Sequence, residues 1–358
     1  MNTYMRAITA ILMLLLLAAC AQTDDRMQKI ETLMQRYQGD VPGASLLVVK
    51  NGKPVVRRAF GMADLERSIK ATPETDYRLA SMTKQFTAAS ILLLRQDGKL
   101  SLDDSVRKWL PELPQSDRAI TIDDMLRHAS GLIDYEDLIP SGTKGQVSDA
   151  DVLKLLSKES RLYFPPGTSY RYSNSGYVLL GLIVERASGE SLPQFLKTRI
   201  FDPLHMAHTL LYEHGHGPEV PNRAYGYSMT GGRWVQTDQD TTSATRGDGG
   251  IYSNIDDLAK WDAALYDNRL LNDESRKLAF SPHNKVIGEI DVDWYGYGWR
   301  LHHDQSRGDE IWHSGESIGF RNVILRWPKQ HLTVILLSNR DDPQPYDTAR
   351  KIAALFQP

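Results

Sequence analysis

Cysteine is almost absent from this sequence, because Cys20 is the only one among 358 residues. A single cysteine excludes an internal disulfide and leaves no cysteine cluster for a metal ion. Charge of one sign is not in large excess either, since the formal net charge is −3. A strong basic field is therefore lacking, and no nucleic-acid partner is expected. Internal repeats and low-complexity tracts are also missing from the sequence.

The one long apolar run, residues 7–19, is too short for a comfortable transmembrane span. It predicts the hydrophobic region of a secretory signal peptide over residues 1–19. The LAAC sequence that ends at Cys20 resembles the lipobox of bacterial lipoproteins. That resemblance implies lipidation of Cys20, a lipidated linker over 20–26 and a periplasm-facing membrane anchor. Ala21 slightly favours the outer membrane. A plain signal peptide with an incidental cysteine is the alternative.

Strand patterns lie at both ends of the chain, and helical patterns dominate the middle. Apolar spacing predicts helices, and runs of β-branched residues bounded by turn signals predict strands. The expected strands are 43–49, 55–60, 295–301, 319–327 and 332–338, and the expected helices are 27–37, 81–95, 122–127, 149–156, 173–187, 255–266 and 346–356. Hydrophobic residues make up 41% of the chain, which is enough to bury a large core.

The order of these patterns predicts an α/β protein with two domains. If strands from both ends share one antiparallel sheet, residues 27–75 and 245–358 form an α/β sheet domain. Residues 76–244 then form a mainly helical domain inserted into it. Residues 215–248 are polar and rich in glycine. They are predicted to form a long surface loop beside a cleft.

The pattern Ser-x-x-Lys, which places a base near a serine nucleophile, occurs three times. Ser81 and Lys84 open a run that is apolar on most faces, where a lysine has no ordinary structural reason to lie. Their spacing puts them on one helix face, and the helix N-terminus adds partial positive charge. The pairs Ser105–Lys108 and Ser141–Lys144 fall in polar or loop segments. An N-cap serine beside a solvated lysine is the alternative for Ser81.

The pattern Tyr-x-Asn also occurs three times. Tyr172 and Asn174 follow a stiff Pro-Pro-Gly turn and precede an apolar helix, so a rigid position at a helix start is predicted. The pair Tyr252–Asn254 also precedes a helix and competes with it. The pair Tyr266–Asn268 has the features of a helix end.

The only His-x-Gly sequence is His313-Ser314-Gly315, which precedes a strand-like run beginning near Ile318. Glycine at this position would let a substrate approach a strand edge closely. A histidine at a strand start with no role in chemistry is the alternative.

These three motifs, in this order, resemble the class C β-lactamase-related superfamily of serine hydrolases. It includes penicillin-binding proteins, DD-peptidases, D-amino-acid peptidases and amidases, family VIII esterases and class C β-lactamases. The resemblance covers nearly the whole mature chain and includes segments 121–132, 203–206 and 249–253. It implies a β-lactamase/transpeptidase-like fold, an antiparallel sheet flanked by helices with a mainly helical inserted domain. It also places Tyr252 in a structural segment, which leaves Tyr172 as the site tyrosine.

The resemblance implies catalytic roles for three residues. Ser81 would attack a carbonyl and form an acyl-enzyme that water releases. Lys84 and Tyr172 would share the general-base work, and the sequence leaves open which one takes the proton. No metal or other cofactor is required.

The resemblance also implies a substrate-binding set around the nucleophile. Asn174 would hold the substrate carbonyl. His313, with Ser314 and Gly315, would line the strand edge and shape the proton network or the substrate's anionic end. The backbone N–H groups of Ser81 and Glu316 would form the oxyanion hole. An inward Glu316 carboxylate would oppose a negative intermediate, so this side chain is expected to point away.

Two features favour peptidase-like relatives. His313 stands where class C β-lactamases have the lysine of Lys-Thr-Gly. Arg300 stands where such a peptidase has an arginine for the substrate carboxylate, and a surface arginine at a strand end is an equal alternative. We therefore expect a DD-carboxypeptidase or D-amino-acid peptidase that acts on a small molecule or peptide in the cell envelope. An esterase or a β-lactamase is the alternative.

Three rival interpretations are weaker. Ser317 lies in a Gly-x-Ser-x-Gly sequence, but only His331 follows it and no acid lies between them, against the order of an α/β-hydrolase triad. The histidines at 205, 208, 214 and 216 lack ordered acidic or cysteine partners, so no metal site is expected. A binding protein that has lost activity is disfavoured by the complete set of Ser81, Lys84 and Tyr172.

Overall fold

The computed structural model describes residues 25–116, 118–213 and 217–357. The predicted signal peptide, residues 1–19, and the predicted lipidation site, Cys20, lie outside the described residues. No helix in the described ranges combines the length and apolar character needed to cross a membrane.

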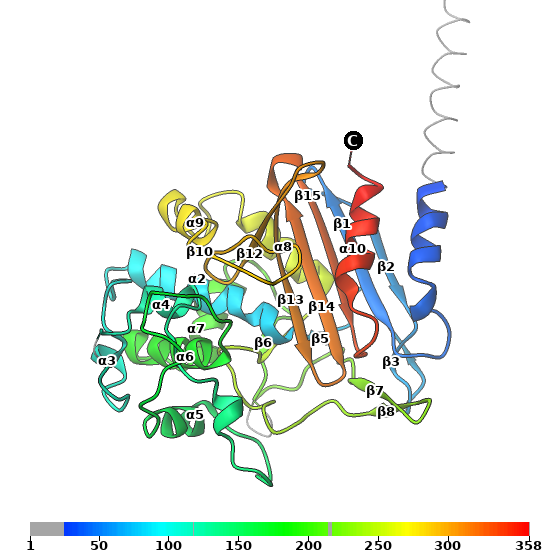
Figure 1. Ribbon diagram of the computed structural model, residues 1–358. Helices are drawn as coiled ribbons and strands as arrows, with labels where there is room; N and C mark the ends of the chain where they lie inside the picture. Colours follow the sequence, from blue (N-terminus) through cyan, green and yellow to red (C-terminus); the bar gives the residue numbers. More distant parts are fainter. Residues whose placement is uncertain (1–24, 117, 214–216, 358) are drawn as a thin grey trace, which may run out of the picture.

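An eight-stranded antiparallel sheet forms the centre of the molecule (Figure 1). Its strand order is β10-β11-β12-β13-β14-β15-β1-β2. The strands are β1 (Ala44–Lys50), β2 (Lys53–Phe60), β10 (Asn284–Lys285), β11 (Trp294–Tyr295), β12 (Arg300–Asp304), β13 (Gly308–Ser317), β14 (Phe320–Trp327) and β15 (Leu332–Ser338). The two ends of the chain therefore share one sheet, as the sequence predicts, with Ala44 opposite Ser338 and Lys50 opposite Leu332.

The central strands are rich in β-branched and aliphatic residues and are buried on both faces. Side chains alternate between the two faces of a strand, so Leu46 and Val48 enter one apolar cluster whereas Leu47 and Val49 enter the other. The β1–β2 turn is made by Asn51 and Gly52, whose φ angles are 52° and 72°. A two-residue hairpin turn of this kind favours these residues.

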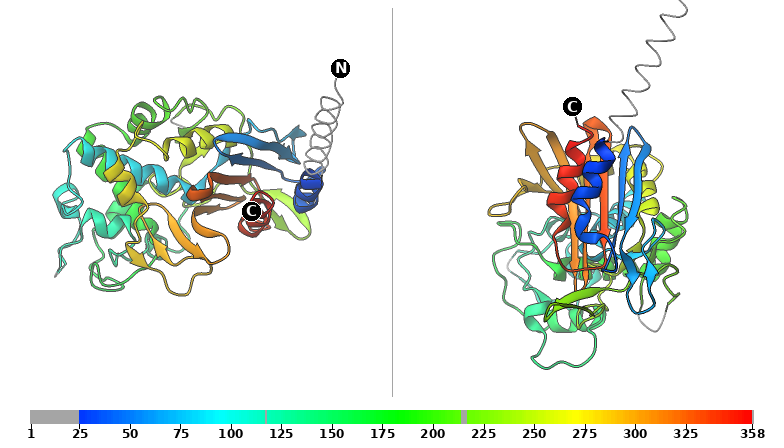
Figure 2. Two further views of the ribbon diagram at one scale, coloured as in Figure 1. Left: turned by 90° about the horizontal axis from the view of Figure 1, so that it is seen from above. Right: turned by 90° about the vertical axis from the view of Figure 1, so that its right-hand side faces the viewer.

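Helices cover both faces of the sheet. A helix over residues 25–33 and helix α10 (Pro345–Ala354) lie side by side on one face (Figure 2). The remaining helices lie on the side of the other face, which the helix over residues 255–264 contacts directly at β1 and β15. They are α2 (Lys84–Gln96), α3 (Val106–Trp109), α4 (Ile122–Leu126), α5 (Asp149–Leu156), α6 (Asn174–Ser188), α7 (Leu192–Leu196), α8 (Ile255–Ala264) and α9 (Asp273–Ala279). One continuous apolar cluster joins these helices to the sheet.

Short elements complete the chain. The single-turn helices are η1 (Gln35–Tyr37), η2 (Ala80–Thr83), η3 (Tyr135–Leu138), η4 (Lys197–Phe201) and η5 (Pro328–Gln330). The small sheets are β3 (Met62–Asp64) with β4 (Ile69–Lys70), β5 (Tyr77–Arg78) with β9 (Ile251–Ser253) and β6 (Leu210–Leu211), and β7 (Tyr227–Thr230) with β8 (Arg233–Gln236). Helix α6 shows how such elements are bounded, because Ser173 Oγ accepts the N–H of Gly176 at its start and Gly189 ends it with a φ of 79°.

Three local predictions are wrong in detail. The strand predicted over 295–301 is two strands, β11 and β12, because the chain turns at Gly298 with a φ of 76°. His313 lies inside β13, and residues near Ile318 form the β13–β14 turn instead of a strand start. The loop predicted over 215–248 contains the β7–β8 hairpin. Short strands of mixed polarity lack the apolar alternation that sequence analysis detects.

Candidate active site

Ser81 lies in the short helix η2, which leads directly into α2. The preceding residue, Ala80, has a φ of 49°, a left-handed conformation that costs a residue with a Cβ about 1 kcal/mol. The backbone around it is held in place, because Leu79 N donates to Ile251 O at 2.8 Å. The Ser81 side chain is half-buried. The predicted nucleophile is therefore presented on a strained turn at the start of a buried helix.

Lys84 is fully buried in the first turn of α2. Its Nζ lies 3.1 Å from Ser81 Oγ, 2.8 Å from Asn174 Oδ1 and 3.1 Å from the carbonyl oxygen of Asp248. The aromatic ring of Tyr172 lies beside it, with the ring centroid 4.9 Å from Nζ. The structure thus brings together all three residues that the sequence predicts to be catalytic.

Tyr172 is held by an aromatic cluster. Its ring lies 4.4 Å from the ring of His128, which in turn accepts the N–H of Ser173 on Nδ1 at 3.1 Å. The Tyr172 hydroxyl is buried and makes no hydrogen bond to any residue that the structure describes. Burial, with Lys84 nearby, holds the pKa of His128 well below its usual value. His128 is therefore a neutral ring that positions Tyr172.

Asn174 is the first residue of α6, and both ends of its amide have partners. Its Oδ1 accepts from Lys84, and its Nδ2 donates to Glu136 Oε1 at 3.0 Å. Its backbone N–H donates to Asp134 at 3.2 Å. Burial, and then the neighbouring Asp134 carboxylate, raise the pKa of Glu136.

Residues 313–317 of β13 extend beyond the part that pairs with β12, which stops at Trp312. His313 is fully buried, with Nε2 3.0 Å from Tyr295 Oη and Nδ1 2.6 Å from the carbonyl oxygen of Ser314. Burial, then the Arg300 cation, hold its pKa well below the usual value. The ring is therefore neutral near pH 7 and contributes hydrogen bonds without charge.

Gly315 makes the closest approach between this strand and the Ser81 turn. A Cβ on Gly315 would lie 1.9 Å from the carbonyl oxygen of Leu79 and 3.3 Å from Met82 N. The sequence argument expected this glycine to admit a substrate. The structure adds a second reason, which is that β13 and η2 could not otherwise lie in contact.

Ser314 and Arg300 are brought to the same place, and the side chain of Glu316 points away from it, as the sequence predicts. Arg300 Nη1 donates to Ser314 Oγ at 3.2 Å, and its guanidinium lies 5.3 Å from the centre of the Tyr172 ring. The Arg300 side chain is only 14% exposed, so it is not a free surface arginine. Glu316 is exposed and directed outward, where it accepts from Gln344 at 3.1 Å and lies 3.5 Å from Arg321.

Sequence analysis missed several residues of this site. Asp248 supplies a backbone carbonyl to Lys84, and burial raises the pKa of its side chain against the opposing effect of the Lys84 cation. His128 and Glu136 hold Tyr172 and Asn174, and Tyr295 holds His313. The three motifs contain none of these residues, because each acts through a contact with a residue distant in the sequence.

The competing motifs lie elsewhere in the fold. Tyr252 is buried in β9, and the ring of Tyr266 stacks on His331 at 5.1 Å. Ser317 ends β13 with its hydroxyl buried. Within the described ranges, no group of three or more histidine, cysteine, aspartate or glutamate side chains is arranged to hold a metal ion. His214 and His216 lie outside those ranges.

Comparison with known proteins gives one consistent family. A model described as Beta-lactamase matches residues 26–357. Penicillin-binding protein 4* of Bacillus subtilis is 33% identical over 332 residues, which cover 89% of this chain and 72% of that protein. Protein flp of Staphylococcus aureus is 31% identical over 334 residues and 88% of this chain, but the match spans only 64% of that protein's length.

Solved structures agree with the sequence comparison. The octameric penicillin-binding protein homologue from Pyrococcus abyssi has a TM-score of 0.82 at 28% identity, covering 93% of this chain and 77% of that chain. The D-amino acid amidase from Ochrobactrum anthropi SV3, complexed with L-phenylalanine amide, has a TM-score of 0.78 at 25% identity, covering 93% of this chain and 97% of that chain.

Proposed function

This chain belongs to the Beta-lactamase family, and from that premise we propose that it is a serine hydrolase with DD-carboxypeptidase or D-amino-acid peptidase activity. The observation that carries the proposal is the position of Lys84, a fully buried lysine 3.1 Å from Ser81 Oγ. A buried cationic group is costly unless it is paired or used. The likeness to a penicillin-binding protein and to a D-amino acid amidase supports the substrate class.

Lys84 is the general base in this proposal. The proposed base is the deprotonated form of Lys84, which has two N–H bonds and one lone pair, and the oxygens of Asn174 and Asp248 match the two N–H bonds. The lone pair then faces Ser81 Oγ and accepts its proton as Oγ bonds to the substrate carbonyl carbon. Tyr172, whose buried hydroxyl has no partner among the described residues, passes its proton to the leaving group and takes one back from Lys84, so that both side chains return to their starting state.

The acyl-enzyme is an ester on Ser81, and water releases it by the reverse proton path. Water attacks the ester carbon, its proton passes to Lys84, and Ser81 Oγ leaves and receives that proton from Lys84. The negative oxygen of each tetrahedral intermediate is stabilised by the N–H groups of Ser81 and Glu316. The outward direction of the Glu316 side chain removes a carboxylate that would otherwise oppose this charge.

Arg300 binds the carboxylate of the substrate in this proposal. Its guanidinium lies between the rings of Tyr172 and Trp312, so an anion on it would sit beside the proposed proton relay. A guanidinium presents a planar pair of donors that matches a carboxylate. This position favours a substrate with a carboxylate close to the scissile bond, as in a peptide that ends in a D-amino acid.

The test uses residues 25–358, which lack the predicted signal peptide and Cys20. The intact mass of this protein is measured after exposure to a penicillin. A lasting adduct that is absent in Ser81→Ala would support a DD-peptidase type of enzyme. Fast loss of the antibiotic with little adduct would indicate a β-lactamase instead. If neither occurs, hydrolysis of D-amino acid amides and of simple esters decides between a D-peptide hydrolase and an esterase. Full activity in Ser81→Ala would refute the nucleophile.

The envelope location is a separate part of the proposal and rests on the predicted signal peptide over residues 1–19 and on Cys20, which follows it. We propose that Cys20 carries a lipid that anchors the protein to the bacterial envelope, facing the periplasm. Labelled palmitate in growing cells should be incorporated into the wild type but not into Cys20→Ala. Incorporation that persists in Cys20→Ala would contradict the anchor, and equal release of both proteins into the soluble fraction would do the same.

A further inference from the structure

Residues 286–293 connect β10 to β11 and carry a carboxylate to the side of Arg300. Glu289 Oε2 accepts from Arg300 Nε at 3.3 Å, and Glu289 Oε1 accepts from the hydroxyl of Tyr170 at 3.2 Å. The Glu289 side chain is 34% exposed, whereas that of Arg300 is 14% exposed. An ion pair with one partly exposed member is weak, because water competes for the carboxylate.

Arg300 itself is held firmly, independently of Glu289. Its guanidinium lies 5.3 Å from the centre of the Tyr172 ring and 5.0 Å from that of Trp312, and Nη1 donates to Ser314 Oγ at 3.2 Å. Two aromatic faces and a hydroxyl therefore fix its position. Glu289 is not needed to orient Arg300, and its effect on this cation is mainly to occupy and neutralise it.

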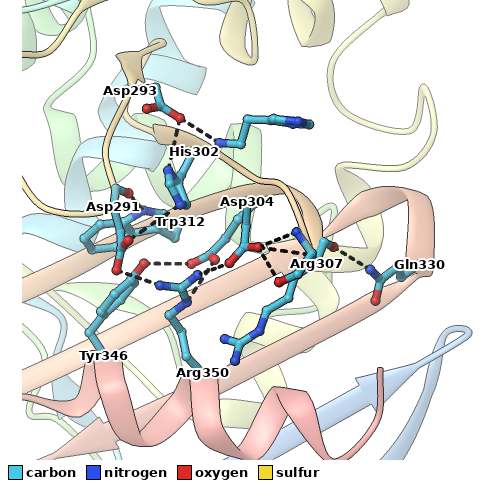
Figure 3. A network of polar contacts seen from close by, with 12 residues as sticks. Asp291, Asp293, His302, Asp304, Arg307, Trp312, Gln330, Tyr346 and Arg350 are labelled. Atoms are coloured by element: carbon cyan, nitrogen blue, oxygen red, sulfur yellow. Dashed lines mark hydrogen bonds and ion pairs between the residues drawn. The ribbon is translucent and has the colours of Figure 1, made fainter. Parts of the chain in front are cut away.

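The segment that carries Glu289 is anchored at both ends and bare at its tip. At its start Val286 is 5% exposed and its N–H donates to the carbonyl oxygen of Asp293 at 2.9 Å. Figure 3 shows the other end, where Arg350 Nη1 donates to Asp291 at 2.6 Å and Trp312 Nε1 donates to the Asp291 carbonyl oxygen at 3.0 Å. Asp293 lies 3.0 Å from His302 Nδ1. In contrast, Ile287 and Ile290 are each 86% exposed. A tip with so little apolar contact moves at low cost.

We propose that Glu289 is an internal competitor for the substrate's carboxylate on Arg300. In the free protein Glu289 occupies the arginine, and a substrate carboxylate replaces it while the tip of the 286–293 segment moves outward. Glu289 thereby lowers affinity for carboxylate-bearing ligands and leaves affinity for neutral ligands unchanged. This inference rests on the proposed function, because it assigns the substrate's anionic end to Arg300.

The first test measures binding without catalysis. Calorimetry measures the dissociation constants of N-acetyl-D-alanine and of its neutral amide for two proteins, Ser81→Ala and the double variant Ser81→Ala/Glu289→Gln. Glu289→Gln should tighten binding of the carboxylate about three- to tenfold and leave binding of the amide unchanged. Asp293→Asn is the matched control, because it removes one carboxylate from the same segment without contact to Arg300. It should change neither affinity.

The sign of the change decides the inference. Weaker binding of N-acetyl-D-alanine in Glu289→Gln would mean that Glu289 orients Arg300, which overturns the proposal. Unchanged binding, or no binding to either form, would overturn it as well. The proposed function is tested separately, by measuring turnover of a D-amino acid amide with the wild-type protein, which retains Ser81. Absence of turnover would contradict the function, whereas the calorimetry would still report on Glu289.

Discussion

Replacing Gly315 with alanine should push strand β13 away from the turn that carries Ser81. The new Cβ would lie 1.9 Å from the carbonyl oxygen of Leu79 and 3.0 Å from its carbonyl carbon. Ordinary contact begins near 3.4 Å, so the strand and the turn must separate by about 1.5 Å. Both atoms belong to the backbone, and no flexible side chain is available to move instead.

The expected loss of activity is larger than the expected loss of stability. Overpacking of this kind costs about 1–3 kcal/mol of unfolding free energy. The two proposed oxyanion donors belong to different elements, the N–H of Ser81 to the turn and the N–H of Glu316 to β13. A shift of this size between the turn and the strand therefore moves the two donors apart. Removing one such donor, or misplacing a reacting group by about 1 Å, lowers the rate about 10²- to 10³-fold.

The assay combines kcat/KM for acylation by a fluorescent penicillin, or for an ester substrate, with the melting temperature. Gly249→Ala is the control, because its Cβ would meet the nearest atoms of Ala80 only at 3.8 Å. It adds the same methyl group close to the same turn and should leave kcat/KM unchanged. Wild-type kcat/KM in Gly315→Ala would refute the argument that this contact sets the site's geometry.

Two predictions concern the dependence of stability on pH, and they have opposite signs. Burial holds the pKa of His128 well below 6.5, so its contribution to the unfolding free energy is fully present above pH 6.5 and is lost progressively as the pH falls below 6.5. His128→Asn keeps an acceptor for the Ser173 N–H and should lose less stability over this range in urea unfolding. Burial raises the pKa of Glu310 from 4.5 to about 7, so its contribution falls by up to about 3 kcal/mol as the pH rises from 4.5 to 7. Glu310→Gln should remove that decline, and an unchanged slope in either variant would count against the corresponding assignment.

Much of the fold was predictable because the relevant signals are local. The strand β15 and the helix α6 have uninterrupted apolar or periodic patterns, and their bounds match the predicted ranges within a residue or two. The prediction that β1 and β15 share a sheet followed from strand patterns at both ends of the chain. The strands β11 and β12 were missed as separate elements, because the turn at Gly298 lies against the backbone of Lys84, a contact between distant segments that no local pattern marks.

The sequence by itself determined which residues were available for chemistry. Spacing offered three Ser-x-x-Lys pairs, and the apolar helix that follows favoured Ser81 and Lys84, whereas the family resemblance favoured Tyr172 over Tyr252. Only the tertiary structure decided what surrounds them. Lys84 meets Asn174 across 90 positions of the chain and Asp248 across 164 positions. Such contacts depend on how helices and sheet pack together, and no short pattern encodes them.

The same reason explains why sequence reasoning was informative about one carboxylate, Glu316, and not about another, Glu289. Sequence reasoning expected Glu316 to point away from the site, and the structure directs it outward to Gln344. It gave no sign of Glu289, which reaches Arg300 from a neighbouring segment. The residue type determines the charge of a side chain, but the tertiary structure determines which partner residue the charge contacts. That partner determines whether the charge aids, opposes or competes with a bound substrate.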